Sequence, residues 1–170
     1  MAIDTVHDLF VYELGLVREV ESSGAVLFEF MYHNVGNEEL KKLVASAQQD
    51  CRRWRDNISA CLRAFGSEPV AAPSETVNGI YRGFEEFIRL QPAQDMKDQF
   101  AVDAAIRFMN LAITTHQTLI DWAVLLNETE CIKHLYSNMV HKRHRAAELE
   151  RFSHELGAWI LTVAAASRTS

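Results

Sequence analysis

The sequence predicts an all-α fold, a four-helix bundle with one short helix in a crossover connection. Apolar residues recur at alternating spacings of four and three along four long segments, as they do on the buried faces of bundle helices. Only three prolines and seven glycines occur, and most of them fall between those segments. Because 170 residues are enough for one full hydrophobic core, we assign residues 1–170 to a single domain.

The first helix is predicted to begin after Asp4 or Thr5 and to end near His33, because Thr5 and Asp8 have the spacing of a capping box. Its predicted core face consists of Phe10, Leu14, Val17, Glu21, Gly24, Phe28 and Met31. Glu21 is the one charged residue on this face. A buried carboxylate is costly unless it is paired or bound to a metal ion, so the partner of Glu21 is the central functional question.

The second helix is predicted over 38–65, with Asn37 as its N-cap and Gly66 as its C-terminal stop. Its core face consists of Leu40, Val44, Ala47, Cys51, Trp54, Ile58, Cys61 and Phe65. The tight turn before Asn37 makes this helix the antiparallel partner of the first.

A linker at 67–73 leads to a shorter helix over 75–90. Gly79 and Gly83 weaken this helix, so we assign it to the crossover and not to the bundle itself.

Two further long helices are predicted over 95–126 and 130–165, joined by a tight turn. The core face of the first consists of Val102, Ala105, Met109, Ala112, His116, Leu119, Ala123 and Leu126. The core face of the second consists of Ile132, Leu135, Met139, Lys142, Ala146, Leu149, Ser153, Leu156, Ile160 and Val163. Two tight turns and one long connection are typical of a bundle with a crossover.

Composition restricts the class of partner. The net charge of −6 gives no reason to expect nucleic acid or an anionic membrane as partner. No apolar run approaches about 18 residues, and no signal peptide is visible, so we expect a cytoplasmic protein without a membrane span. In that compartment Cys51, Cys61 and Cys131 are expected to be reduced thiols.

Several short segments resemble the YciF-type ferritin-like family of bacterial stress proteins. They are the opening Asp8-Leu9-Phe10-Val11-Tyr12-Glu13-Leu14 followed by Glu21, then Phe65-Gly66, Val77-Asn78-Gly79-Ile80 and Thr118-Leu119. The resemblance covers nearly the whole chain and implies a ferritin-like bundle that is often dimeric. The biochemical activity of that family is not established.

The resemblance also implies where metal ligands are expected, and most of them are missing. The family's first-helix glutamate is kept as Glu21. Its other core ligands fall on Ala47 and Asp50 in the second helix, on Met109 and Ala112 in the fourth and on Lys142 in the fifth. The chain therefore has an eroded metal-ligand set by this comparison.

Charge balance suggests a different partner for Glu21. If the first and last helices run parallel, Glu21 and Lys142 differ in height by about 5 Å, which their side chains can bridge. We expect a core polar cluster of Glu21 and Lys142, with His116 or Asp50 adding hydrogen bonds. Two alternatives stay open: Lys142 extends to solvent, or Glu21, Asp50 and His116 bind one iron or manganese ion.

No enzyme motif is present, so catalysis is not the expected function. We expect a metal-free binding or assembly module, associated with stress, that has a protein partner or forms a homodimer through a helix face. Large apolar residues outside the repeating pattern motivate the dimer: Phe28, Phe30, Trp122 and Trp159. One alternative is a metal-dependent (iron or manganese) oxidoreductase or peroxide-handling protein with a reduced ligand set. Another is a small-molecule carrier with space at Gly24, Ala47, Ala105 and Ala112.

Overall fold

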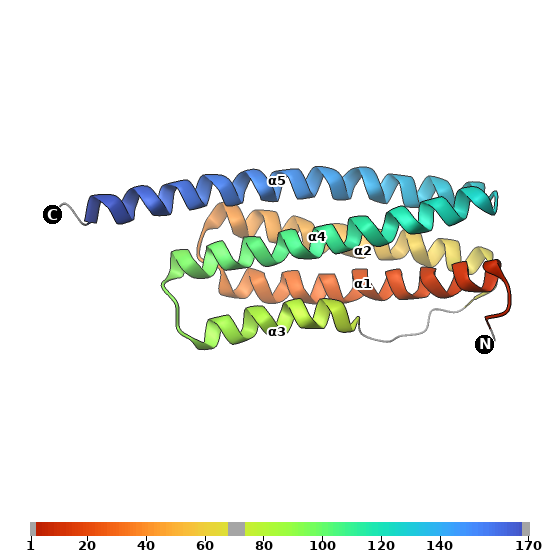
Figure 1. Ribbon diagram of the computed structural model, residues 1–170, viewed down its shortest axis with the longest axis horizontal. Helices are drawn as coiled ribbons and strands as arrows, with labels where there is room; N and C mark the ends of the chain where they lie inside the picture. Colours follow the sequence, from red (N-terminus) through yellow and green to blue (C-terminus); the bar gives the residue numbers. More distant parts are fainter. Residues whose placement is uncertain (1–2, 68–73, 168–170) are drawn as a thin grey trace.

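The structure is a computed structural model that describes residues 3–67 and 74–167. It consists of five helices, α1 (Val6–Asn34), α2 (Glu38–Ala64), α3 (Glu75–Arg89), α4 (Gln94–Leu125) and α5 (Thr129–Ser167), as Figure 1 shows. Within the described ranges there is no strand, and no helix is both long and apolar enough to cross a membrane. The all-α prediction is therefore correct, and its helix ends differ from the observed ones by one or two residues.

The four long helices form two antiparallel hairpins, α1–α2 and α4–α5, which pack side by side. Helix α2 contacts α5 and α1 contacts α4, so α1 and α5 lie on one diagonal of the bundle. These two helices run in the same direction, whereas α2 and α4 run in the opposite one (Figure 1). The short helix α3 lies outside the bundle against α1 and α4.

Helix ends follow the capping rules that the sequence suggests. The Thr5 hydroxyl accepts a hydrogen bond from the Asp8 backbone N–H at 3.1 Å, and the Asp8 carboxylate accepts one from the Thr5 backbone N–H at 2.9 Å. The Asn37 side chain accepts from the first turn of α2, and the Ser74 hydroxyl caps α3. Most of the predicted linker, residues 68–73, lies outside the described residues.

The predicted core faces are the observed ones. Every predicted core residue of α1 is buried, and in the other long helices only Ser153 and members near the helix ends are partly or fully exposed. Two residues invoked for the dimer do not lie on a free surface. Phe28 is fully buried, and the Phe30 ring packs 4.6 Å from that of Tyr81 in α3, measured between ring centroids. The crossover helix α3 thus covers Phe30, which the sequence analysis assigned to a dimer interface.

Candidate functional site

A buried ion pair joins the two diagonal helices at the centre of the bundle. Lys142 Nζ in α5 lies 2.6 Å from Glu21 Oε1 in α1, and both side chains are completely buried. The long lysine side chain is what spans the diagonal, because the backbones of α1 and α5 do not approach each other. The structure thus brings together the two charges that the sequence places on opposite core faces, and Lys142 does not reach solvent.

Helix α2 supplies an aromatic and a thiol to this pair. The Lys142 ammonium lies 3.6 Å from the centroid of the Trp54 ring, where the ring quadrupole attracts a cation. The Cys51 thiol lowers the pKa of the Glu21 carboxyl. Glu21 Oε2 has no nitrogen or oxygen partner among the residues that the structure describes. The ammonium is therefore held between a carboxylate and an aromatic face.

His116 in α4 completes the cluster as a neutral side chain. Its Nδ1 lies 3.1 Å from the Ala112 carbonyl oxygen and 3.7 Å from Glu21 Oε1. Its Nε2 lies 3.4 Å from the Asn138 side-chain nitrogen, which can only donate. The hydrogen therefore resides on Nδ1, and Nε2 accepts. Asn138 also donates to the Trp54 carbonyl oxygen at 3.1 Å and accepts from the Asn57 amide at 2.7 Å.

Burial dominates the electrostatics of this cluster. Desolvation raises the pKa of the Glu21 carboxyl above its ordinary value of 4.5, and the charge of Lys142 opposes the rise. Desolvation lowers the pKa of the Lys142 ammonium, and Glu21 opposes that fall. Desolvation and then the Lys142 charge lower the pKa of His116 well below 6.5. A single positive charge and a single negative charge thus share a medium in which neither is stable alone.

Asp50 does not join the cluster, contrary to the expectation from sequence. Its carboxylate accepts from Arg145 at 2.8 Å and from Arg53 at 2.9 Å at the edge of the bundle, with 16% of the side chain exposed. Asp50 directly precedes the core residue Cys51 in α2. Because one residue rotates the side-chain direction by about 100°, Asp50 points towards the edge of the bundle. Arg145, one turn after Lys142, is the cation that it meets.

Sequence reasoning missed Asn138 and treated Trp54 and Cys51 as apolar filling only. A signal for Asn138 was available, since it precedes Lys142 by four residues and so shares its face of α5. The contact between the Trp54 ring and the ammonium depends on the rotamer of Lys142, which the spacing of residues along a helix does not predict. Trp54 contacts the ammonium itself, whereas Asn138 contacts His116 and Cys51 acts on Glu21.

The residues at the bundle centre do not fit a di-metal centre. Within residues 3–67 and 74–167, no group of three or more His, Cys, Asp and Glu side chains is placed to hold a metal ion. His116 Nδ1 lies 3.7 Å from Glu21 Oε1, but Asp50 pairs with Arg145 at the edge of the bundle, and the Lys142 ammonium already binds Glu21 Oε1. Buried Ala47, Met109 and Ala112 offer no charged donor in its place.

The space expected for a small molecule at the bundle centre is filled by protein. A Cβ added to Gly24 would lie 2.2 Å from Phe108 Cζ, so the ring of Phe108 occupies the room that glycine leaves. Ala47, Ala105 and Ala112 are fully buried within the same hydrophobic cluster. The carrier interpretation has no support from these residues.

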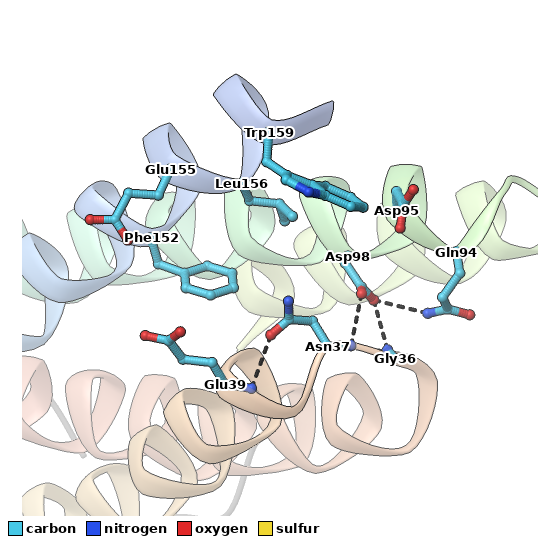
Figure 2. A pocket seen from close by; sticks show the side chains of 10 residues that line it. All are labelled: Gly36, Asn37, Glu39, Gln94, Asp95, Asp98, Phe152, Glu155, Leu156 and Trp159. Carbon is cyan, nitrogen blue, oxygen red and sulfur yellow. Dashed lines mark hydrogen bonds between the residues drawn. The ribbon is translucent and has the colours of Figure 1, made fainter. Parts of the chain in front are cut away.

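A separate pocket of about 480 Å³ lies at the end of the bundle, between the α1–α2 turn, the start of α4 and the last turns of α5. Its lining residues are Gly36, Asn37, Glu39, Gln94, Asp95, Asp98, Phe152, Glu155, Leu156 and Trp159. Figure 2 shows Trp159 and Leu156 across the pocket from the turn that carries Gly36 and Asn37. The lining residues include four carboxylates and no lysine or arginine, so the pocket is suited to a cation.

Hydrogen bonds to Asp98 hold one wall of this pocket together. Asp98 in α4 accepts from the backbone N–H groups of Gly36 and Asn37, each at 2.8 Å, and from the Gln94 side chain at 2.9 Å (Figure 2). Asp98 therefore ties the α1–α2 turn to the start of α4.

Comparison with known proteins agrees with this architecture. Residues 5–158 match the family model described as Domain of unknown function (DUF892). The Escherichia coli stress protein YciF has a similar structure, with a TM-score of 0.85 and 15% identity over 92% of this chain and 99% of that one. YcfI from Rhodopseudomonas palustris has a TM-score of 0.81 and 18% identity over 88% and 97% of the two chains.

A ferritin-like, diiron-carboxylate protein from Bacillus anthracis also shares the fold, with a TM-score of 0.70 and 17% identity over 90% and 99% of the two chains. No protein among curated sequences matches this chain. At such low identities the solved structures show the fold alone, whereas the family model covers most of the chain. The chain therefore belongs to the family described as Domain of unknown function (DUF892), and its fold is the ferritin-like bundle that it shares with these structures.

Proposed function

We propose that this protein is a metal-free ferritin-like bundle that acts as a cytoplasmic, stress-associated binding and assembly module without catalysis. The observation that carries the proposal is the buried contact between Lys142 Nζ and Glu21 Oε1 at 2.6 Å. An ammonium group at this point supplies the positive charge that a metal ion would otherwise bring to the carboxylate.

Two features favour the ammonium over a metal ion. A divalent cation beside Lys142 would experience like-charge repulsion in a medium of low polarity, where screening is weak. Both nitrogens of His116 are already engaged, Nδ1 with the Ala112 carbonyl and Nε2 with Asn138. The site would have to break these contacts and displace the lysine before a metal ion could bind.

Metal analysis tests the proposal. Protein expressed with added iron and manganese is expected to contain neither above trace level, and Fe(II) or Mn(II) added without oxygen is expected to leave its melting temperature unchanged. A Lys142→Glu variant removes the ammonium and adds a carboxylate, and it is expected to gain stability on addition of Fe(II) or Mn(II). Stoichiometric iron in the parent protein would overturn the proposal and favour the metal-dependent oxidoreductase or peroxide-handling alternative.

The acidic end pocket is where the proposal places a protein partner. Exposed Glu39, Asp95 and Glu155 give it negative charge, and Trp159, which is 51% exposed, offers an aromatic face. Carboxylates and an indole ring together favour an ammonium or guanidinium group, so the fitting ligand is a lysine or arginine side chain of a partner protein.

Titration with an arginine-containing peptide tests this placement. The variant Glu39→Gln/Asp95→Asn is expected to weaken peptide binding. The matched control Asp56→Asn/Glu130→Gln removes the same charge from exposed positions elsewhere and is expected to retain binding. Equal weakening by both variants would show a nonspecific charge effect and exclude the pocket.

A further inference from the structure

Two of the three cysteines lie opposite each other near one end of the bundle. Cys61 is in the last turn of α2, which ends at Ala64, and Cys131 is in the first turn of α5, which begins at Thr129. Each is a free thiol that is 2% exposed, and both belong to the hydrophobic cluster at that end. Cys51, the third thiol, lies in the central cluster more than two turns away along α2.

The packing of α2 against α5 brings these two thiols together. The Asn138 side chain donates to the Trp54 carbonyl oxygen at 3.1 Å, which fixes the register of the antiparallel pair. Seven residues forward from Trp54 on α2 is Cys61, and seven residues back from Asn138 on α5 is Cys131. A step of seven residues returns to nearly the same helix face, so the two cysteines face each other one heptad along the same seam.

The two sulfurs are chemically distinct. The interaction between the two thiols raises the pKa of Cys61 and lowers that of Cys131, and burial raises the pKa of both. Cys131 also lies at the N-terminal end of α5, where the helix dipole favours a thiolate. Its place in the first turn of α5 makes Cys131 the nucleophile of the pair and Cys61 the second thiol. Burial instead raises the pKa of Cys51 and makes it unreactive.

We propose that Cys61 and Cys131 form a redox-active dithiol that hydrogen peroxide converts into an intramolecular disulfide. The Cys131 thiolate attacks one peroxide oxygen, the O–O bond breaks, and a sulfenic acid forms with release of hydroxide. The Cys61 sulfur then attacks the Cys131 sulfur, an S–S bond forms, and the sulfenic hydroxyl leaves as water. The two protons lost by the thiols convert both oxygens to water, and the peroxide takes up the two electrons.

The position of the pair favours this chemistry in spite of its burial. The first turn of a helix opens locally more readily than a helix centre, which admits a small neutral oxidant to Cys131. The product links the end of α2 to the start of α5 and so joins the two helical hairpins covalently. Such a link constrains the unfolded chain and raises stability when formed.

Thiol counting after peroxide treatment of the full chain tests the proposal. The parent protein is incubated with hydrogen peroxide, quenched and unfolded, and its free thiols are alkylated. We expect the count to fall from three to one, with Cys51 as the alkylated residue, and to return to three after dithiothreitol. Peptide mapping is expected to recover a fragment in which Cys61 is linked to Cys131.

Variants separate this pair from general oxidation. Cys51→Ala is expected to keep the Cys61–Cys131 link, and Cys61→Ala is expected to stop at a trappable sulfenic acid on Cys131. Peptide mapping of the parent protein decides the question even where a variant folds poorly. Three thiols remaining after peroxide, or a link that involves Cys51 or joins two chains, would overturn the proposal.

Discussion

At the scale of single residues, the Glu21–Lys142 pair gives specificity more than stability. Desolvation is the largest influence on the pKa of both groups, so the attraction between the two charges mainly offsets the cost of burying them. Removing one partner is a different matter, because the other is then stranded as an unpaired buried charge. Replacing both residues is therefore expected to change the free energy of unfolding little, whereas replacing either one alone is expected to lower it strongly.

Lys142→Met is expected to lower the free energy of unfolding by about 3–5 kcal/mol at neutral pH, because it strands the Glu21 carboxylate. The double variant Glu21→Gln/Lys142→Met is expected to recover most of that loss, since it removes both charges and keeps the volume. Urea denaturation of the parent, both single variants and the double variant measures the coupling. A Lys142→Met protein as stable as the parent would contradict the importance of the pair.

The lowered pKa of His116 predicts the direction in which folding stability changes with pH. Its folded-state pKa lies below the ordinary value of 6.5, so below pH 6.5 the unfolded chain binds a proton that the folded protein does not. Stability is therefore complete above pH 6.5 and is lost as the pH falls below it, by up to about 1.4 kcal/mol per pH unit.

Denaturation between pH 7 and pH 5 measures this loss. His116→Gln, which cannot be protonated, is expected to show a shallower decrease than the parent, whereas the exposed control His141→Gln is expected to follow the parent. Identical slopes for the parent and His116→Gln would show that His116 does not control the pH dependence.

How much of the site was predictable follows from helical geometry. Heptad spacing placed Glu21, His116 and Lys142 on core faces, and depth along parallel helices placed the first and last of these within about 5 Å of each other in height. Spacing does not give the direction of a side chain at the edge of a face. Asp50 therefore turned out to pair with Arg145. The amide of Asn138, four residues before Lys142, was predictable from spacing and was overlooked.

At the scale of elements, close approach of α1 and α4 depends on one glycine. The Phe108 ring in α4 fills the space above Gly24 in α1, and it also packs edge-to-face on Phe28 with 5.2 Å between ring centroids. A sequence pattern marks Gly24 as a core position but cannot say that an aromatic ring needs the room.

Two glycines of α1 are expected to respond to alanine with opposite signs. Gly24→Ala is expected to lose about 1–3 kcal/mol, because its Cβ would lie 2.2 Å from Phe108 Cζ in a filled core. Gly15→Ala has nothing within 4 Å of the added Cβ and is expected to gain up to about 1 kcal/mol from helix propensity. Thermal denaturation measures both. A stabilised Gly24→Ala protein would show that α1 and α4 are not packed as described.

The α1–α2 turn depends on α4 through Asp98. Asp98→Ala is expected to cost about 1–3 kcal/mol in total, because it removes the acceptor of the Gly36 and Asn37 backbone N–H groups. The control Asp95→Ala removes an exposed carboxylate from the same helical turn and is expected to cost less than about 1 kcal/mol. Chemical denaturation compares the two, and equal losses would mean that only helix charge matters here.

At the scale of the whole molecule, the fold followed from few features of the sequence. The spacing of apolar residues, the capping residues and one long connection were enough to predict the bundle and its crossover helix. The reason is that the packing of helices depends mainly on their apolar faces. The cover that α3 provides was not predictable, since it depends on contacts such as Phe30 with Tyr81 across about fifty residues of chain. Contact with α3 removes Phe30, and packing on Phe108 in α4 removes Phe28, from any argument about a dimer.

The proposed homodimer must therefore use another face. Tyr136 and Val140 in α5 are 58% and 59% exposed, and their spacing of four residues places them side by side on the helix. Tyr12 and Leu16 in α1 form a similar pair, but each is only 45% exposed. The α5 pair offers more apolar surface for burial, so we expect it to contribute most of the association energy.

Sedimentation velocity at micromolar concentration is expected to give a dimer for the parent protein and a monomer for Tyr136→Glu/Val140→Glu, with unchanged helix content by circular dichroism. Charged groups at these positions would have to lose water without a partner, which association through this face cannot compensate. Tyr12→Glu/Leu16→Glu places the same charges at the same spacing on α1 and is expected to remain dimeric. A monomeric parent would remove the dimer from the proposed function, and dissociation by the α1 variant alone would move the interface to that helix.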